Sequence, residues 1–244
     1  MRKDRRICLE NISQRIENYW DARSSDFSRV RREEIASADF AAWNEIIAAH
    51  LPAGQLKILD VGTGAGFFAV LLAKLGHSVT GIDMSARMLD EARKNAETFN
   101  VRADFFKMNA QALDFGDETF DAVITRNLTW TLPDVVQAYK EWRRVLKTGG
   151  VLMNFDSNYG DKNFRNEETC AKGEVEDEML VECQEIKDAL RISTHTRPGW
   201  DIERLGMLGF SVDFDEDIAP RVHVGKIPYD PIPLFAIYAA KNFC

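Results

Sequence analysis

The sequence has few cysteines, no long apolar run and no excess of basic residues. Its four cysteines, Cys8, Cys170, Cys183 and Cys244, form no Cys-x-x-Cys pair, and no histidine stands at ligand spacing from them. We therefore predict reduced thiols and no metal site. The longest apolar run, 67–73, is too short to cross a bilayer, and the charged N-terminus lacks the apolar core of a secretory signal. These absences predict a cytoplasmic protein without a membrane partner.

The charge balance is acidic. The 244 residues include 31 Lys and Arg against 39 Asp and Glu, which gives a net charge of −8. Proteins that coat nucleic acids bind phosphates with clustered basic side chains, whereas the basic stretches here, 2–6 and 29–32, suit solvated helix faces. We therefore expect no nucleic-acid partner. The length fits one large domain, or one domain with a small appendage.

Strand and helix patterns alternate through the middle of the chain. Residues 9–50 have apolar positions at helical spacing and predict an N-terminal helical segment. Short apolar runs then predict five strands, at 57–61, 78–83, 103–108, 120–125 and 151–155. Helical patterns separate several of them, at 65–75, 85–99 and 133–146. Such alternation predicts an α/β fold with a parallel sheet and helices on both faces.

The alternation stops at a polar, acid-rich segment. Residues 160–198 predict a helical insertion over the ligand face, with one helix near 174–190. The remainder predicts a helix at 200–208 and strands at 210–217 and 234–241, with a proline-containing loop at 227–233. We accordingly divide the chain into an N-terminal helical cap, a ligand-binding core, a lid insertion and a segment that completes the sheet. Their predicted bounds are 1–54, 55–159, 160–198 and 199–244.

A glycine-rich turn follows the first predicted strand. Gly62-Thr63-Gly64-Ala65-Gly66 comes directly after Asp60, and glycines let a ligand approach the main chain closely. A dinucleotide fingerprint needs a further glycine where Phe67 stands, and the lysine of a phosphate-binding loop is absent. Asp83 ends the second strand, where a carboxylate can accept both hydroxyls of a ribose. The pattern therefore favours a nucleoside with a zwitterionic tail.

From residue 58 to about 158 the chain resembles the class I S-adenosylmethionine-dependent methyltransferases, in their broad small-molecule group. The run LDVGTGAGFFAVLLAKLGHSVTGIDMS is similar to the first motif of that family and its ribose-binding acid. FDAVITRNLTWTL, followed by EWRRVLKTGG, is similar to its fourth-strand motif and the next helix. The resemblance implies a Rossmann-like, doubly wound sheet of seven strands with the last strand antiparallel. It also implies S-adenosylmethionine as the cofactor and S-adenosylhomocysteine as the product.

The resemblance further implies a set of cofactor-binding residues. Asp83 would bind the ribose, Met84 would pack on the adenine, and an N-terminal aromatic segment would close over the cofactor. The family usually has an aspartate after the third strand, where this sequence has Asn109, whose amide oxygen can still accept a hydrogen bond. The expected residues are Tyr19, Trp20, Asp60, Gly62, Thr63, Gly64, Gly66, Asp83, Met84, Asn109, Ala110, Gln111, Arg126 and Asn127.

Residues on the methyl-accepting side are harder to assign. We name His195 and Tyr159 as candidate catalytic residues, His195 because imidazole transfers protons near neutral pH. Trp130, Arg197 and Trp200 are candidate substrate contacts, with Arg197 suited to a carboxylate. The alternatives at these positions are a packed tryptophan, a salt-bridged arginine and a surface histidine. The other three histidines, at positions 50, 77 and 223, are assigned no role.

The expected reaction is in-line methyl transfer to a small molecule. Asn127-Leu128-Thr129-Trp130 lacks the two prolines of the motif that modifies exocyclic amines, and no proline precedes a cysteine as cytosine methylation requires. Methylation of a protein or RNA, and a non-catalytic cofactor-binding regulator, are the alternatives. The acceptor atom stays open, as do the need for a general base and the choice between monomer and homodimer.

Overall fold

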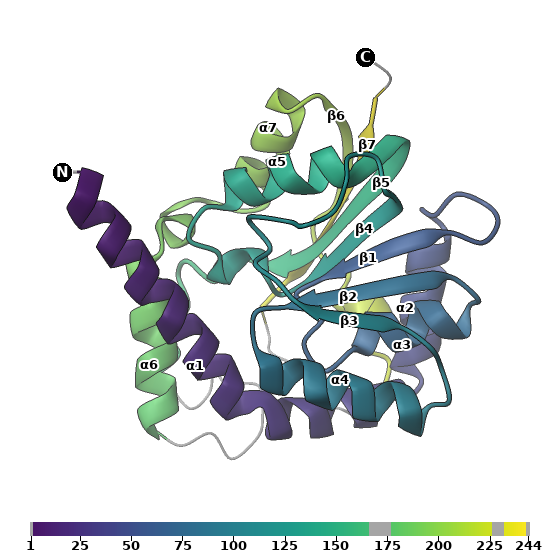
Figure 1. Ribbon diagram of the computed structural model, residues 1–244, viewed down its shortest axis with the longest axis horizontal. Coiled ribbons are helices and arrows are strands. Elements are labelled where there is room, and N and C mark those ends of the chain that lie inside the picture. The colour runs from purple at the N-terminus through teal and green to yellow at the C-terminus, as the bar shows by residue number, and fades with distance from the viewer. Residues whose placement is uncertain (1, 166–176, 226–231, 243–244) are drawn as a thin grey trace.

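The computed structural model describes residues 2–165, 177–225 and 232–242, with side chains from Ile12 onward. Seven strands form one sheet in the order β3-β2-β1-β4-β5-β7-β6 (Figure 1). The first five of these are parallel, and β7 is antiparallel to both of its neighbours. The strands are β1 (Lys57–Val61), β2 (Ser78–Asp83), β3 (Asp104–Lys107), β4 (Phe120–Arg126), β5 (Leu146–Ser157), β6 (Phe210–Asp215) and β7 (Leu234–Lys241). The predicted fold class is confirmed.

Helices cover both faces of the sheet. On one face α2 (Asp39–Ala48), α3 (Phe67–Lys74), α4 (Ala86–Thr98) and the short α8 (Ala219–Val222) contribute to one apolar cluster. On the other face α5 (Val135–Val145) and α7 (Gly199–Met207) contribute to a second cluster. The strand order turns back between β1 and β4, and open α/β sheets bind ligands at such a point. The topology therefore places the carboxyl ends of β1, β2 and β4 where a site is expected.

Capping side chains begin two of these helices. The Ser85 hydroxyl accepts a hydrogen bond from the Met88 backbone N–H at 3.0 Å, and the Asp134 carboxylate accepts one from Gln137 at 3.0 Å. Each cap satisfies a backbone donor that the first helical turn leaves without a partner. The predicted helices 85–99 and 133–146 therefore lie within one or two residues of their observed bounds.

A long N-terminal helix passes across the carboxyl edge of the sheet. α1 (Arg2–Ile35) lies beside α6 (Asp177–Ala189) and then beside α4 (Figure 1). Arg15 pairs with Glu182 and Glu185 of α6, both at 2.6 Å. No helix in the described ranges is long and apolar enough to span a membrane. The helical insertion predicted at 160–198 thus contributes α6, which packs against α1.

Several predicted bounds differ from the structure by one or two residues, and one strand differs by more. The strand predicted at 151–155 extends over Leu146–Ser157, because Leu146 continues the ladder opposite Phe120 across a bulge. The helix predicted at 174–190 is observed from Asp177, and 174–176 lie outside the described residues. The loop predicted at 227–233 also lies mostly outside them, as do Cys170 and Cys244. Local sequence therefore located the element centres better than their ends.

Candidate active site

The glycine turn after β1 is shaped by its backbone. Gly62 and Gly64 have φ of +66° and +53°, in the left-handed region that favours glycine. Thr63 fixes the turn, because its N–H donates to Ile82 at 2.9 Å and its hydroxyl donates to Asp60 Oδ2 at 2.6 Å. A Cβ on Gly64 would lie 3.1 Å from the Phe27 ring of α1. Phe27 of α1 therefore packs directly against the Gly64 backbone, which leaves no room for a side chain at this position.

Gly66 has a different role from the other two glycines. A Cβ at this position would lie 3.1 Å from the Cβ of Ala92 on α4. Gly66 has a φ of +83° and is the N-cap residue of α3. Gly66 therefore lies at a close approach of α3 and α4, and it is not among the residues of the cavity wall described below.

Asp83 stands at the end of β2 with its carboxylate beside the turn. Its Oδ2 accepts a hydrogen bond from Gly64 N–H and its Oδ1 accepts one from Ser85 N–H, both at 2.9 Å. Each carboxylate oxygen can accept a further bond, so two ribose hydroxyls fit this acid. Burial raises the pKa of Asp83 to about 6 and that of Asp60 to about 7.

A cavity of about 270 Å³ lies over the glycine turn. It is bounded by the carboxyl ends of β1, β2 and β4, by α1 and α6, and by the start of β7. Most of the predicted site residues lie on its wall. They are Tyr19, Trp20, Asp60, Gly62, Thr63, Gly64, Asp83, Met84, Asn109, Ala110, Gln111, Arg126, Asn127, Trp130 and Tyr159.

Two amide side chains on the cavity wall differ in their hydrogen bonding. Asn109 Oδ1 accepts hydrogen bonds from the backbone and side chain of Gln111 at 2.9 and 3.3 Å, so it already caps its own turn. Asn127 Oδ1 is buried and, among the described residues, has no hydrogen-bond partner. Asn127 also has a φ of +52°, which is uncommon for a residue with a side chain. A buried amide oxygen without a partner is an observation that fits a missing ligand.

Aromatic residues of α1 cover the cavity. The Trp20 ring meets the edges of Tyr19 and Phe27, with centroids 5.1 and 5.7 Å apart. Asp21 ties this part of α1 to the sheet side, because its carboxylate accepts a hydrogen bond from the Ser85 hydroxyl at 2.5 Å. The sequence predicted Tyr19 and Trp20 beside the cofactor, and the structure places both on the cavity wall together with Phe27.

Three predicted acceptor-side residues lie outside the cavity wall. His195 stacks on Trp200 with centroids 4.7 Å apart. The Arg197 side chain is only 2% exposed and pairs with Asp201 at 2.8 Å and Asp156 at 3.2 Å. A guanidinium committed to two buried carboxylates has no geometry left for a substrate carboxylate. The structure therefore places Arg197, Trp200 and His195 apart from the predicted site residues that line the cavity.

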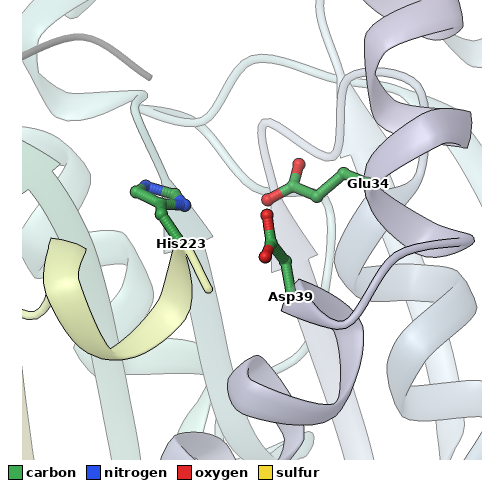
Figure 2. Close-up of side chains that lie close together, drawn as sticks. All are labelled: Glu34, Asp39 and His223. Atoms are coloured by element: carbon green, nitrogen blue, oxygen red, sulfur yellow. The ribbon is translucent and has the colours of Figure 1, made fainter. Parts of the chain in front are cut away.

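A second charged cluster was missed by the sequence analysis. Glu34, Asp39 and His223 bring one ligand-type atom each to within 4.8 Å of one another (Figure 2). His223 lies on the cavity wall, as does Arg126. Glu34 pairs with Arg126 at 2.9 Å and with Arg31 at 2.7 Å. These two guanidiniums balance the carboxylates, so the cluster is an ion-pair site rather than a site suited to a divalent cation.

No local signal could have found this cluster. Glu34 ends one helix, Asp39 begins the next, and His223 follows α8 almost two hundred residues later. Only the spatial approach of α1, α2 and the segment after α8 brings them together. The sequence favoured His195, which precedes a predicted helix. Its place in the sequence does not show how far the side chain lies from the cavity.

Comparison with known proteins agrees with this geometry. Residues 59–154 match the family model described as a methyltransferase domain. A ubiquinone biosynthesis O-methyltransferase of Cereibacter sphaeroides is 29% identical over 55% of this chain and 54% of its own length. A sterol methyltransferase-like protein of Botryococcus braunii is 29% identical over 92% of this chain and 63% of its own length. The chain thus spans about half to two thirds of these curated relatives.

Solved structures show the same fold. A SAM-dependent methyltransferase of Aquifex aeolicus has a TM-score of 0.60 at 19% identity, and the match covers 91% of this chain and 98% of that one. A Bacillus protein named YcgJ gives the same TM-score at 16% identity, covering 84% of this chain and 99% of that one. The sheet order, the glycine turn and the family match agree. Residues 59–154 are therefore similar to a methyltransferase domain, and the chain has the fold of solved S-adenosylmethionine-dependent methyltransferases.

Proposed function

We propose that the protein transfers a methyl group from S-adenosylmethionine to a small-molecule acceptor that binds in the same cavity. The observation that carries the proposal is the shared wall of this cavity. The glycine turn and Asp83 form one part of it, and Trp130 and Tyr159 from the ends of β4 and β5 form another. A cofactor and an acceptor can therefore lie side by side, and such alignment can lower a barrier by roughly 7–11 kcal/mol.

Five residues are suited to hold the cofactor. Gly62 and Gly64 bring main chain without side chains to the cavity wall, Asp83 offers acceptors for the ribose, and Met84 offers an apolar surface to the adenine. Asn127 offers its buried amide oxygen, which has no other partner within the described ranges, to the amino group of the tail. When bound, S-adenosylmethionine supplies a methyl group on a positively charged sulfur.

The aromatic residues of α1 would complete this site. Tyr19 and Trp20 lie over the cavity, where aromatic faces attract a sulfonium and exclude water. Burial raises the pKa of Tyr19, so its phenol stays neutral. We propose that α1 acts as a cap, with α6 of the segment predicted at 160–198 packed against it.

An aromatic wall supports a small and largely apolar acceptor. The Trp130 ring lies 4.8 Å from Tyr159 and 5.5 Å from Phe164 between ring centroids. Burial raises the pKa of Tyr159, so its phenol remains a hydrogen-bond donor that could orient an acceptor. The relatives named for ubiquinone and sterol pathways are consistent with apolar acceptors. A concave cavity of about 270 Å³ also suits a small molecule better than a protein or RNA.

Calorimetry with S-adenosylhomocysteine tests cofactor binding directly. The wild-type protein should bind it, and Asp83→Ala should weaken binding by about 1.5–3 kcal/mol, because hydrogen bonds to a charged group are lost. Asp90→Ala is the matched control, since this aspartate lies exposed on α4, where it pairs with Arg93. Binding of NAD in preference to S-adenosylhomocysteine would contradict the proposal.

Turnover needs a separate measurement. Wild-type protein, labelled S-adenosylmethionine and a small-molecule extract of cells should give a labelled product below the size of a peptide. The same mixture with total protein or RNA in place of the extract should remain unlabelled. Label transferred only to protein or RNA would reassign the acceptor, and cofactor binding without any transfer would favour a regulatory protein.

A further inference from the structure

The cluster of Glu34, Asp39 and His223 joins three segments at one end of the cavity. Glu34 comes from the last turn of α1, Asp39 from the first turn of α2, and His223 directly follows α8. Figure 2 shows the edge of the imidazole facing both carboxylates. Glu34 and Asp39 are 0% exposed, whereas His223 is half-buried and lies on the cavity wall. His223 is thus the member of the cluster that a ligand in the cavity can reach.

Backbone hydrogen bonds hold the imidazole beside the carboxylates. The His223 N–H donates to Ala219 at 2.9 Å, and the Gly225 N–H donates to Asp39 Oδ1 at 2.5 Å. A Cβ at Gly225 would lie 2.8 Å from the same oxygen, so a glycine is needed for this contact. The other oxygen, Asp39 Oδ2, is buried and has no hydrogen-bond partner in the described part of the chain. It remains available to an imidazole N–H.

Burial, together with two neighbouring guanidiniums, keeps the His223 ring neutral. Burial is the largest cause, and Arg126 of β4 and Arg31 of α1 add to it, so that the pKa of His223 falls to about 3. Glu34 acts in the opposite direction, and α2 contributes Asp39 and the ring of Trp43, whose centroid lies 6.5 Å away. At neutral pH the imidazole therefore has a lone pair that can take a proton.

We propose that His223 is the general base of the methyl transfer, that it takes the proton of a hydroxyl acceptor, and that Asp39 and Glu34 are its positioning residues. The inference rests on the proposed function. The acceptor hydroxyl gives its proton to the imidazole while its oxygen bonds to the methyl carbon, and the electron pair of the broken carbon–sulfur bond stays on sulfur. The methylated acceptor, S-adenosylhomocysteine and a proton are the products.

A weakly basic imidazole suffices for this step. The hydroxyl becomes strongly acidic as its oxygen shares electrons with the methyl carbon, so the proton needs only a nearby acceptor. The imidazolium that forms lies beside Glu34, whose charge favours it, and near the second oxygen of Asp39, which can accept a hydrogen bond. Neutral histidine beside a buried carboxylate is an arrangement that other enzymes use for proton transfer.

Parallel assays of His223→Asn and His195→Asn test the assignment. His195 is the matched control, because it stacks on Trp200 outside the cavity wall. With the extract and labelled cofactor, His223→Asn should lower the initial rate at pH 7 by about 10²–10⁴-fold, and His195→Asn should leave it unchanged. The His223→Asn rate should recover at alkaline pH, where the acceptor hydroxyl ionises without a base. An unchanged rate in His223→Asn overturns the proposal.

Calorimetry separates this proposal from the one it rests on. The affinity of His223→Asn for S-adenosylhomocysteine should stay within about twofold of wild type, because a general base contacts the acceptor rather than the cofactor. A parallel loss of affinity would make His223 a cofactor contact and would overturn the base assignment. Failure of the wild-type protein to bind S-adenosylhomocysteine would instead overturn the proposed function.

Histidine NMR tests the enclosure of His223 without any acceptor. His223→Asn identifies its resonance among the four histidines of the chain. This resonance should remain in the neutral form down to about pH 5, well below the ordinary histidine pKa of about 6.5. Protonation at that ordinary value would mean a solvated ring and would overturn the assignment.

Discussion

Two buried clusters of charged side chains flank the cavity, and they differ in how completely they are satisfied. Arg197 donates hydrogen bonds to Asp201, Asp156 and Thr129 through all three of its nitrogens. In the other cluster Asp39 Oδ2 has, in the described ranges, no hydrogen-bond partner, and His223 reaches the cavity. We call Arg197 with Asp156, Asp201 and Thr129 the closed cluster, because its groups bond to one another. We call Glu34, Asp39 and His223 the open cluster, because His223 lies on the cavity wall.

This difference separates a structural role from a chemical one. A buried ion pair with every group satisfied fixes the elements that carry it, here β5, α7 and the turn η1 (Thr129–Thr131). Asp156 also accepts the Trp130 N–H at 3.2 Å, so this cluster sets one wall of the cavity indirectly. An incompletely satisfied cluster on a cavity wall is the kind of group that binds or reacts.

The largest effect is expected from breaking the closed cluster. Arg197→Met leaves Asp156 and Asp201 buried without their countercharge, so the free energy of unfolding should fall by about 3–5 kcal/mol. Urea denaturation measures this change. Arg221→Met is the control, because the exposed pair between Arg221 and Asp215 should contribute at most about 1 kcal/mol. A fully stable Arg197→Met would show that the closed cluster has no structural role.

The affinity for the cofactor should depend on pH through Asp83, which lies on the same cavity wall as the open cluster's His223. Burial raises the pKa of Asp83 to about 6, so the carboxylate is ionised above that pH and protonated below it. Protonation removes an acceptor for the ribose, and affinity for S-adenosylhomocysteine should fall by up to about tenfold per pH unit below that value. Calorimetry between about pH 5 and pH 8 follows this decline on both sides of the raised pKa. Asp83→Asn should bind weakly at every pH, and an unchanged slope in that variant would assign the titration to another group.

The smallest effect is expected from Asp39→Asn in the open cluster. Burial and the charge of Glu34 raise the pKa of Asp39. A raised pKa in the folded state contributes stability at low pH that is lost as pH rises through the folded value. Asparagine keeps an oxygen for the Gly225 N–H and removes this loss, so the variant should be slightly more stable than wild type at about pH 8 and equal at about pH 4. Thermal unfolding at both pH values measures it, and destabilisation at the higher pH would mean that ionised Asp39 is a net stabiliser.

Local patterns predicted the fold well because each of them is carried by adjacent residues. The strands Lys57–Val61, Ser78–Asp83 and Leu234–Lys241 have the predicted bounds, since short apolar runs end at polar or glycine positions. Strand β5 was predicted too short because Gly149 and Gly150 look like a turn in sequence. Its ladder with β4 and the bulge at Phe120 hold these glycines in the strand, and that pairing depends on a distant segment.

The sequence by itself determined the donor side of this protein. Gly62, Gly64 and Asp83 lie within 22 consecutive residues, and a strand, a turn and a helix suffice to bring them together. The acceptor side was decided by tertiary structure. Arg197 became part of a closed ion pair and His223 reached the cavity, because both positions depend on how segments far apart in the chain pack against the sheet. Burial and charge pairing, which set the chemistry of these side chains, exist only in the folded protein.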